Sequence, residues 1–475
     1  MIDLVIYIFL ICIYNSILFF GKKYGLNVIF FNVPLLIFIA YILKKNKKIN
    51  NKRGLLFMIP ILLLSLSYLI YDNMFFKIFN VLVIVLLFAL TYLYTIKKTS
   101  RISEIILDII KLIFMPLTCI GRFYRVVITK INNILKLSDS NKSKVKSIII
   151  VIPIVIVVLL LLTSADMIFN NIFSNMFKFT KNISIGRIIG RIISILILFT
   201  YLGSSINYIL FGYSKEKPET VKETKIDNFT IKLLLSVLNI VYIVFDFIQI
   251  RSLILHQGLS NINYAEYARS GFFQLMFISV INIIIILISK KTKEDTKYNK
   301  VMSILMILLT FIIIVSSFLR MYMYEQAYGY TLLRLLVYVS LITETILLIP
   351  TLVYIINPKV KILNCFISII VTVYTLLSLC PVDYFIAKNN INRYYKTNKI
   401  DVDYLINFST DNIPLLCDVY DDLEFKKDYK KDNFKRYLKY MYKYNKSDSI
   451  FEFNISRRKA TKVLKEFITE NNKWK

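Results

Sequence analysis

Ionisable side chains within long apolar runs are the residues of this sequence that could do chemistry. Asp246 and Glu344 lie inside runs of Ile, Leu, Val and Phe, and Arg320 and Arg334 lie near the ends of two such runs. A charge at the centre of a bilayer costs about 3 kcal/mol or more, so such residues usually face a partner or a water-filled site. The carboxylates could act as bases, and the guanidinium groups could bind carboxylate or phosphate.

Nine residues make up the candidate ligand-binding set. Most of them are predicted to lie in one layer at the extracytoplasmic rim of the membrane, and Glu344 lies deeper. The sequence has 46 Lys and 14 Arg, yet every basic member of the set is Arg, which indicates a need for guanidinium geometry. The set consists of Arg187, Arg191, Asp246, Glu266, Arg269, Arg320, Glu325, Arg334 and Glu344.

Three interpretations of this set remain open. The arginines could pair with the carboxylates and lock the bundle. They could instead line a water-accessible pocket that opens outward and binds an anionic headgroup or a small acid, which predicts a cavity lined by Arg187, Arg191, Arg320 and Arg334. The side chains could also extend separately toward the membrane surface.

Membrane-spanning helices must position these residues. The chain is 57% apolar with a mean hydropathy of +0.61, beyond what a water-soluble domain tolerates. The apolar runs lack the alternation of a barrel strand and are long enough for helices that cross a core about 30 Å thick. The sequence therefore predicts an all-α, polytopic membrane bundle of about 11 spans with a small helical C-terminal domain. The expected spans are 3–20, 26–43, 54–71, 78–96, 148–164, 183–212, 230–250, 270–289, 300–322, 331–356 and 362–380.

Four parts follow from this pattern. We expect a four-span segment over 1–96, a cytoplasmic amphipathic region over 97–147, a seven-span core over 148–380 and a soluble helical domain over 381–475. Amphipathic spacing in 102–138 predicts helices in the headgroup plane or packed against the bundle, not a span. Helices in the tail are expected near 383–395, 401–419, 432–445 and 455–470, and Asp401 or Asp403 could cap the second of them.

The distribution of basic residues predicts the orientation. With the N-terminus inside, the cytoplasmic connections carry 29 Lys and Arg, against 11 on the opposite side up to residue 380. Eleven spans would then place the C-terminal domain outside the cell.

Several kinds of chemistry have no support in the sequence. His256 is the only histidine, the five cysteines have no CxxC spacing, and no phosphate-binding or nucleophile-elbow motif is present. We therefore expect no metal and no cofactor. The basic residues lie beside the spans rather than on one soluble face, which favours membrane lipids over nucleic acid as partners.

Three stretches of the core and two of the tail resemble a known family when taken in order. On them the chain resembles bacterial multi-pass membrane proteins catalogued as domain-of-unknown-function family 4173. The resemblance covers roughly 150–420 and implies a fold and a membrane address, but no activity and no catalytic residue. The stretches are LLTSADMIF (161–169), NYAEYARSGFFQLMF (263–277), RMYMYEQAYGYTLLRL (320–335), IAKNNINRY (386–394) and DVDYLINFSTDNIPLL (401–416).

The leading functional hypothesis is a non-enzymatic envelope protein of a bacterial cytoplasmic membrane. Its arginine and carboxylate cluster would bind or transport an anionic lipid, a cell-wall precursor or a small acid. One alternative is a membrane-embedded transferase acting on lipid-linked substrates, with Asp246, Glu266 or Glu344 as base. Another is a purely structural partner that presents its tail to other envelope proteins.

Overall fold

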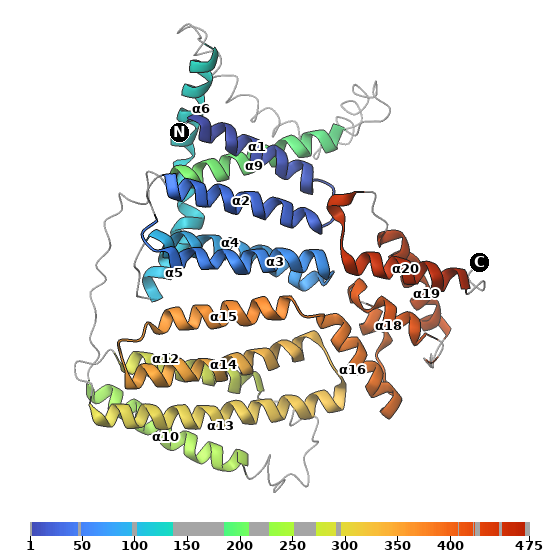
Figure 1. The fold of residues 1–475 in the computed structure, drawn as a ribbon. Coiled ribbons are helices and arrows are strands. Elements are labelled where there is room, and N and C mark those ends of the chain that lie inside the picture. The colour runs from blue at the N-terminus through green and yellow to red at the C-terminus, as the bar shows by residue number, and fades with distance from the viewer. Residues whose placement is uncertain are drawn as a thin grey trace, which may run out of the picture. The chain divides into compact units, whose positions relative to one another are not determined.

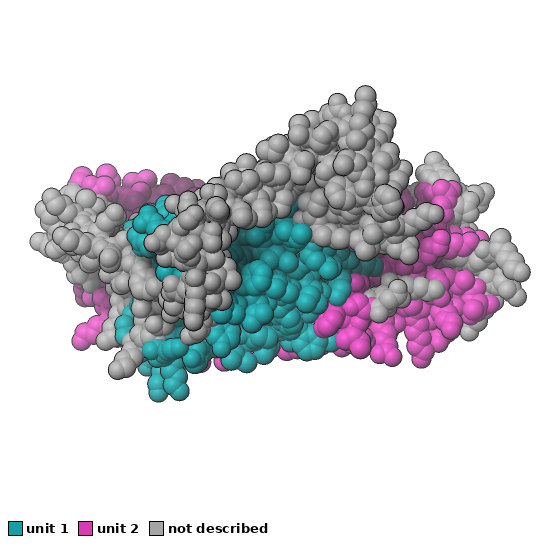
Figure 2. All heavy atoms as spheres, turned by 90° about the horizontal axis from the view of Figure 1, so that it is seen from above, with its two compact units in different colours: residues 1–55, 88–99, 103–219 teal, residues 56–87, 100–102, 220–475 magenta. Residues whose placement is uncertain are grey.

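The fold is described from a computed structural model. It describes residues 2–45, 49–96, 102–135, 185–208, 228–250, 272–290, 296–406, 408–420, 422, 428–445 and 449–470. The chain forms two compact units, which are coloured separately in Figure 2. Unit 1 comprises residues 1–55, 88–99 and 103–219, and unit 2 comprises residues 56–87, 100–102 and 220–475.

Unit 1 is built from apolar helices of the N-terminal half. Phe123 and Phe199 pack edge to face at 5.1 Å inside a core that also holds Val5, Ile8 and Cys12. The helices that contribute to it are α1 (Ile2–Phe19), α2 (Leu26–Lys45), the end of α4 (Met74–Ile96), α5 (Ile102–Phe114), the short η2 (Met115–Cys119), α6 (Ile120–Leu135) and α9 (Ile185–Asn207).

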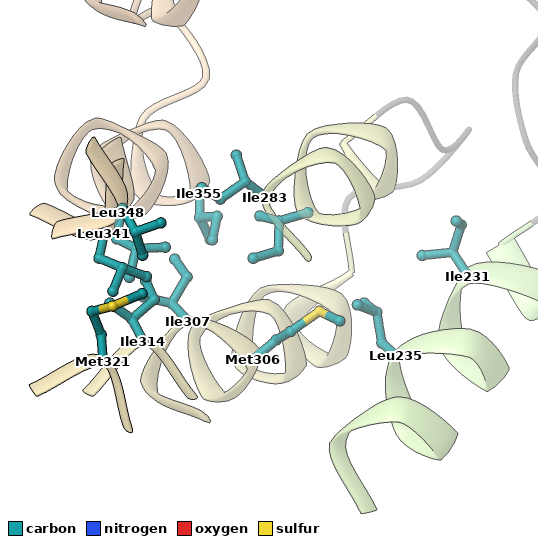
Figure 3. Packing of buried hydrophobic residues seen from close by; sticks show 12 residues of the cluster. Ile231, Leu235, Ile283, Met306, Ile307, Ile314, Met321, Leu341, Leu348 and Ile355 are labelled. Carbon is teal, nitrogen blue, oxygen red and sulfur yellow. The ribbon is translucent and has the colours of Figure 1, made fainter. Parts of the chain in front are cut away.

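The membrane part of unit 2 is a set of long helices that run side by side (Figure 1). Apolar side chains from four of these helices point toward one another and form one core, which Figure 3 shows in close-up. The helices are α3 (Met58–Ile70), which follows η1 (Lys52–Phe57), the start of α4, α10 (Asn228–Gln249), α12 (Phe272–Ser289), α13 (Lys297–Tyr328), α14 (Leu332–Ile356) and α15 (Ile362–Ser378).

Local signals explain where α13 and α14 begin and end. The Thr296 hydroxyl accepts a hydrogen bond from the Asn299 N–H and caps α13. Thr331 caps α14 in the same way by accepting from the Arg334 N–H. Between the two helices Gly329 has φ +81°, a conformation that side chains rarely adopt, so a glycine is needed at this turn.

The C-terminal helices of unit 2 gather at one end of these spans (Figure 1). Phe434, Leu438, Ala460 and Leu464 are fully buried in their core. The Asp401 side chain accepts from the Tyr404 N–H at 3.0 Å, which confirms the predicted cap. The elements are α16 (Val382–Thr397), α17 (Val402–Ile406), η6 (Thr410–Asn412), α18 (Ile413–Asp418), α19 (Asp428–Asn445), η7 (Ile450–Glu452) and α20 (Ile455–Glu470).

The exposed surface of the long helices is apolar. On α10, for example, Ile240, Val244 and Phe247 are each more than half exposed, an arrangement that is stable only in lipid. Eight helices of the described residues are long and apolar enough to cross a membrane, and α15 with α16 would make a ninth if this bent pair were one span. The predicted all-α polytopic bundle is thus confirmed, and no described residue lies in a strand.

The structure does not confirm two of the expected segments. The expected span 148–164 lies outside the described residues. The stretch Asp108–Thr129, predicted to lie in the headgroup plane or to pack against the bundle, is long and apolar enough to cross the membrane. Its placement, the boundaries of the four expected parts and the orientation all stay predictions.

Candidate functional site

Four of the nine candidate residues cannot be related to the others. Arg187 and Arg191 belong to α9 of unit 1, where the Arg191 guanidinium lies over the Phe20 ring at 5.4 Å and is exposed to solvent. The side chain of Arg187 lies outside what the structure describes, as do Glu266 and Arg269. The predicted convergence of these residues with the arginines of unit 2 stays a prediction.

Arg320 lies near the end of α13 and is buried. Its Nη2 donates a hydrogen bond of 2.9 Å to the Oε1 of Gln249 at the end of α10. One of the three interpretations of the sequence paired this arginine with a carboxylate; the hydrogen bond described here is to a neutral amide. This contact joins α10 to α13.

Arg334 and Glu325 meet around the turn between α13 and α14. The Arg334 guanidinium donates to the Gly329 carbonyl and stacks on the Tyr324 ring at 4.2 Å. Glu325 is buried and lies near Arg334, Tyr330 and Tyr338. The turn at Gly329 therefore brings these two side chains near each other, in a contact between consecutive helices.

Polar side chains in the middle of the spans form hydrogen bonds between neighbouring helices. The Glu344 carboxylate on α14 accepts a hydrogen bond from the Ser279 hydroxyl on α12. One turn along α12, Asn282 accepts from the Tyr242 hydroxyl at 2.8 Å and donates to Thr310 at 3.0 Å. These contacts link α10, α12, α13 and α14, and we call Tyr242, Ser279, Asn282, Thr310 and Glu344 the membrane seam.

Asp246 is the exception among these polar groups. It lies on α10, one turn beyond Tyr242, and is only 3% exposed. Among the described residues neither carboxylate oxygen has a hydrogen-bond partner. An isolated buried carboxylate is costly in lipid, so Asp246 remains a functional candidate.

A group of charged residues surrounds the turn that joins α3 to α4, and the sequence analysis did not identify them as candidates. The Asp72 carboxylate forms an ion pair with Lys77 and a second one with Arg457, whose Nε is 3.2 Å from Oδ1. The Thr410 hydroxyl also donates to it at 3.2 Å. The Asp72 N–H in turn donates to the Asp411 carboxylate, at 3.2 Å to Oδ1 and 3.3 Å to Oδ2.

Asp383, in the first turn of α16, bonds to Asn73, the residue that follows Asp72 in the turn between α3 and α4. The Asn73 side chain donates to Asp383 Oδ1 at 2.6 Å, and the Ser409 N–H donates to Oδ2 at 3.1 Å. The Asn73 Oδ1 also accepts from the Phe76 N–H at 3.1 Å and so starts α4. The dipole of α16 favours a carboxylate at this end of the helix.

Asn454, the residue before α20, connects this helix to the end of α3. Its amide donates to the carbonyls of Tyr68 and Tyr71, both at 2.8 Å, and its Oδ1 accepts from the Arg457 N–H at 2.9 Å. The end of α3 is thereby bonded to the residue that caps α20. We call the group around the 71–73 turn the junction cluster, and its members are Asp72, Asn73, Lys77, Asp383, Ser409, Thr410, Asp411, Asn454 and Arg457.

The junction cluster contains three carboxylates and two cations. The pKa of Asp411 is raised to about 6, chiefly by burial and also by the neighbouring Asp383 and Asp72, although hydrogen bonds from Ser456 and Ser409 oppose the shift. One added proton would make the five charges neutral.

A small pocket lies beside the cluster, between α3, α4 and α15. Asn80 donates to the hydroxyls of Ser67 and Ser378, at 2.9 and 2.8 Å, and accepts from Tyr374 at 2.8 Å. The pocket is lined by Ser67, Tyr68, Tyr71, Asn73, Phe76, Lys77, Asn80, Ser378 and Cys380, and it has room for about one water molecule. A lipid headgroup would not fit in it.

The sequence gives only one weak signal for the junction cluster. STDN (409–412) belongs to a stretch that carries the family resemblance, but its partner Asp72 is 339 residues away from Asp411. Such a pairing follows from tertiary structure and cannot be found by local spacing. Among the described residues, no three His, Cys, Asp or Glu side chains form a group that could hold a metal ion.

Comparisons with known proteins give one match. No curated protein and no solved structure matches the chain. A family model described as a domain of unknown function (DUF4153) matches residues 58–419, from the first residue of α3 to the residue after α18. The predicted kind of family, multi-pass proteins of unknown function, is supported, but the number 4173 is wrong. Because the match covers well over half of the sequence, the chain belongs to the DUF4153 family.

Proposed function

We propose that this protein is a non-enzymatic component of a bacterial cytoplasmic membrane that couples its membrane helices to its C-terminal helices and holds the latter in place for partners in the envelope. The observation that carries this proposal is the junction cluster. Asp72, in the turn of a membrane hairpin, bonds to η6 and α20, and the adjacent Asn73 bonds to α16. A movement of the C-terminal helices would thus be transmitted to α3 and α4.

The family match supports the same assignment. It begins at α3, ends after α18 and includes Asp72, Lys77, Asp383 and Asp411. The matched region therefore contains both the membrane hairpin and most of the elements that bond to it. A separate soluble domain attached to an independent membrane anchor would not need this network.

The contacts of Glu344 and Glu325 do not favour a transferase, which leaves Asp246 as the described carboxylate that could still act as a base. Glu344 is bonded to Ser279, and the pocket beside the junction cluster admits about one water molecule. Glu325 lies among Arg334 and two tyrosines. A general base needs an open approach to its substrate, and these groups instead make contacts within the bundle.

Binding of an anionic lipid, a cell-wall precursor or a small acid is a second candidate. It is favoured by the exposure of Arg191 and by Arg334, a partly exposed residue whose guanidinium lies over the Tyr324 ring. Guanidinium groups of this kind bind phosphate and carboxylate.

Complementation of a deletion strain distinguishes the three functions. Sensitivity to detergent and to cell-wall antibiotics would be measured in cells that express matched amounts of each variant. We expect Asp246→Asn and Glu344→Gln to complement, and Asp72→Ala to fail although the protein still inserts in the membrane. Failure of the carboxylate variants alone would support the transferase, and failure of Arg191→Lys or Arg334→Lys alone would support anion binding.

A further inference from the structure

The buried face of α10 becomes polar toward the end of the helix. Its first half, with Ile231 and Leu235, belongs to the apolar core of Figure 3. Asp246 and Gln249 follow on the same face near the end, and both are buried. The Asp246 carboxyl group therefore points into the bundle.

The outer side of α10 is apolar at the level of Asp246. Val244, Phe247 and Ile248 are each more than half exposed, and Ile250 is also exposed. Exposed apolar side chains before and after Asp246 place it at the level of the hydrocarbon core, where water does not solvate a charge. A carboxylate at this position thus needs a cation or a proton.

The helices that contact α10 offer few ionisable groups. Helix α12 carries none. On α13, Lys297, Tyr298 and Lys300 lie at the far end, where the Asn299 amide donates to Asn228 at the start of α10 at 2.8 Å. Within α10 itself, Lys232 lies in the first turns and the Tyr242 hydroxyl donates to Asn282.

The ionisable groups on the other half of α13 are directed elsewhere. The Arg320 Nη2 donates to Gln249, one turn beyond Asp246. The remaining groups lie beside Arg334 or are exposed, and they are Tyr322, Tyr324, Glu325 and Tyr328. In the part of the chain that the structure describes, no cation is paired with Asp246.

A proton fits this site better than a metal cation. Hard metal cations take about six oxygen ligands, and a carboxylate supplies at most two. The neighbours one turn away on the same face, Tyr242 and Gln249, bond to Asn282 and Arg320. A proton needs a single carboxylate oxygen, and both oxygens of Asp246 lack a hydrogen-bond partner among the described residues.

We propose that Asp246 is a proton-binding site of the membrane bundle and holds its proton at neutral pH. With the proton bound the residue is a neutral acid, and the cost of burying a charge is avoided. A carboxyl group that already carries a proton cannot accept one, so this site does not supply the base that a transferase would need. The proposal does not depend on the coupling function.

Infrared difference spectroscopy of the full-length protein in nanodiscs at pH 7 tests the proton. We expect the spectrum of wild type minus Asp246→Asn to contain the carbonyl band of one un-ionised acid per chain and no carboxylate bands. The matched control is wild type minus Asp418→Asn, at an exposed aspartate of α18, which should contain carboxylate bands instead. Asn keeps the shape and the neutrality of the protonated acid. As a second variant, Asp246→Glu should shift the acid band without removing it.

Carboxylate bands in the Asp246 difference spectrum at pH 7 would overturn the proposal. The same measurement with choline in place of Na⁺ then identifies the true partner. Bands that respond to the exchange would assign the site to a metal cation, and bands that do not respond would assign it to a cationic side chain. An acid band that Asp246→Glu leaves unshifted would also overturn the proposal, because the band would then belong to another residue.

Discussion

The membrane seam and the junction cluster differ in how they use polar groups. In the seam, hydrogen bonds between neutral side chains join Tyr242, Asn282 and Thr310, and its one carboxylate, Glu344, accepts from a neutral hydroxyl. In the junction cluster, Asp72 bonds to two cations and a hydroxyl at once. A neutral hydrogen bond between membrane helices contributes about 0.6 kcal/mol, and a charge in the core costs about 3 kcal/mol. Charged networks are therefore tolerated where the spans end, and there they determine which helix ends meet.

The largest effect is expected from removing the centre of the junction cluster. Asp72→Ala leaves Lys77 and the buried Arg457 without their carboxylate, which should lower the free energy of unfolding by about 3–5 kcal/mol. Denaturant unfolding in detergent micelles measures this. The control Asp418→Asn, at an exposed carboxylate of α18, should change it by less than about 0.5 kcal/mol. Equal effects of the two substitutions would remove the distinction between the cluster and the surface.

A smaller loss is expected at the turn that α16 covers. A Cβ on Gly329 would lie 2.6 Å from the Asn390 Oδ1, and the residue has φ +81°. Gly329→Ala should therefore lower the free energy of unfolding by about 1–3 kcal/mol in the same assay. Gly121→Ala, where a Cβ meets nothing within 4 Å, is the matched control and should be close to neutral.

The free energy of unfolding should depend on pH through Asp411 of the junction cluster. Because the pKa of Asp411 is raised to about 6, its protonated form is favoured in the folded state. Its contribution to stability is full below about pH 4 and is lost as the pH rises through 6. Relative to wild type, Asp411→Asn should gain about 1–2 kcal/mol between pH 4 and pH 7. A difference between the two proteins that is constant over this range would contradict the assignment.

The seam should respond more weakly than the cluster. Asn282→Ala removes the bonds to Tyr242 and Thr310 and should cost about 1 kcal/mol. Thr343→Val, which loses a bond to the carbonyl of its own helix, serves as the control and should cost less. A loss at Asn282 as large as that of Asp72→Ala would mean that the two regions do not differ.

Much of the fold follows from local pattern. The expected spans 26–43 and 331–356 match α2 and α14 within two residues, because apolar length alone defines them. The expected helix 401–419 is instead divided into α17, η6 and α18, because residues 409–411 turn toward Asp383 and Asp72. The junction cluster could not be predicted, since its partners come from distant parts of the chain and are ordinary surface residue types.

The coupling of α20 to the α3–α4 turn can be tested by changing one side and observing the other. Arg457→Met removes the cation from α20, and hydrogen exchange of the full-length protein in nanodiscs is followed at residues 71–77. Faster exchange at Asp72, Asn73 and the first turn of α4 is the predicted result, because these residues share the Asp72 carboxylate and its partners. Exchange that changes only within α20 would contradict the account.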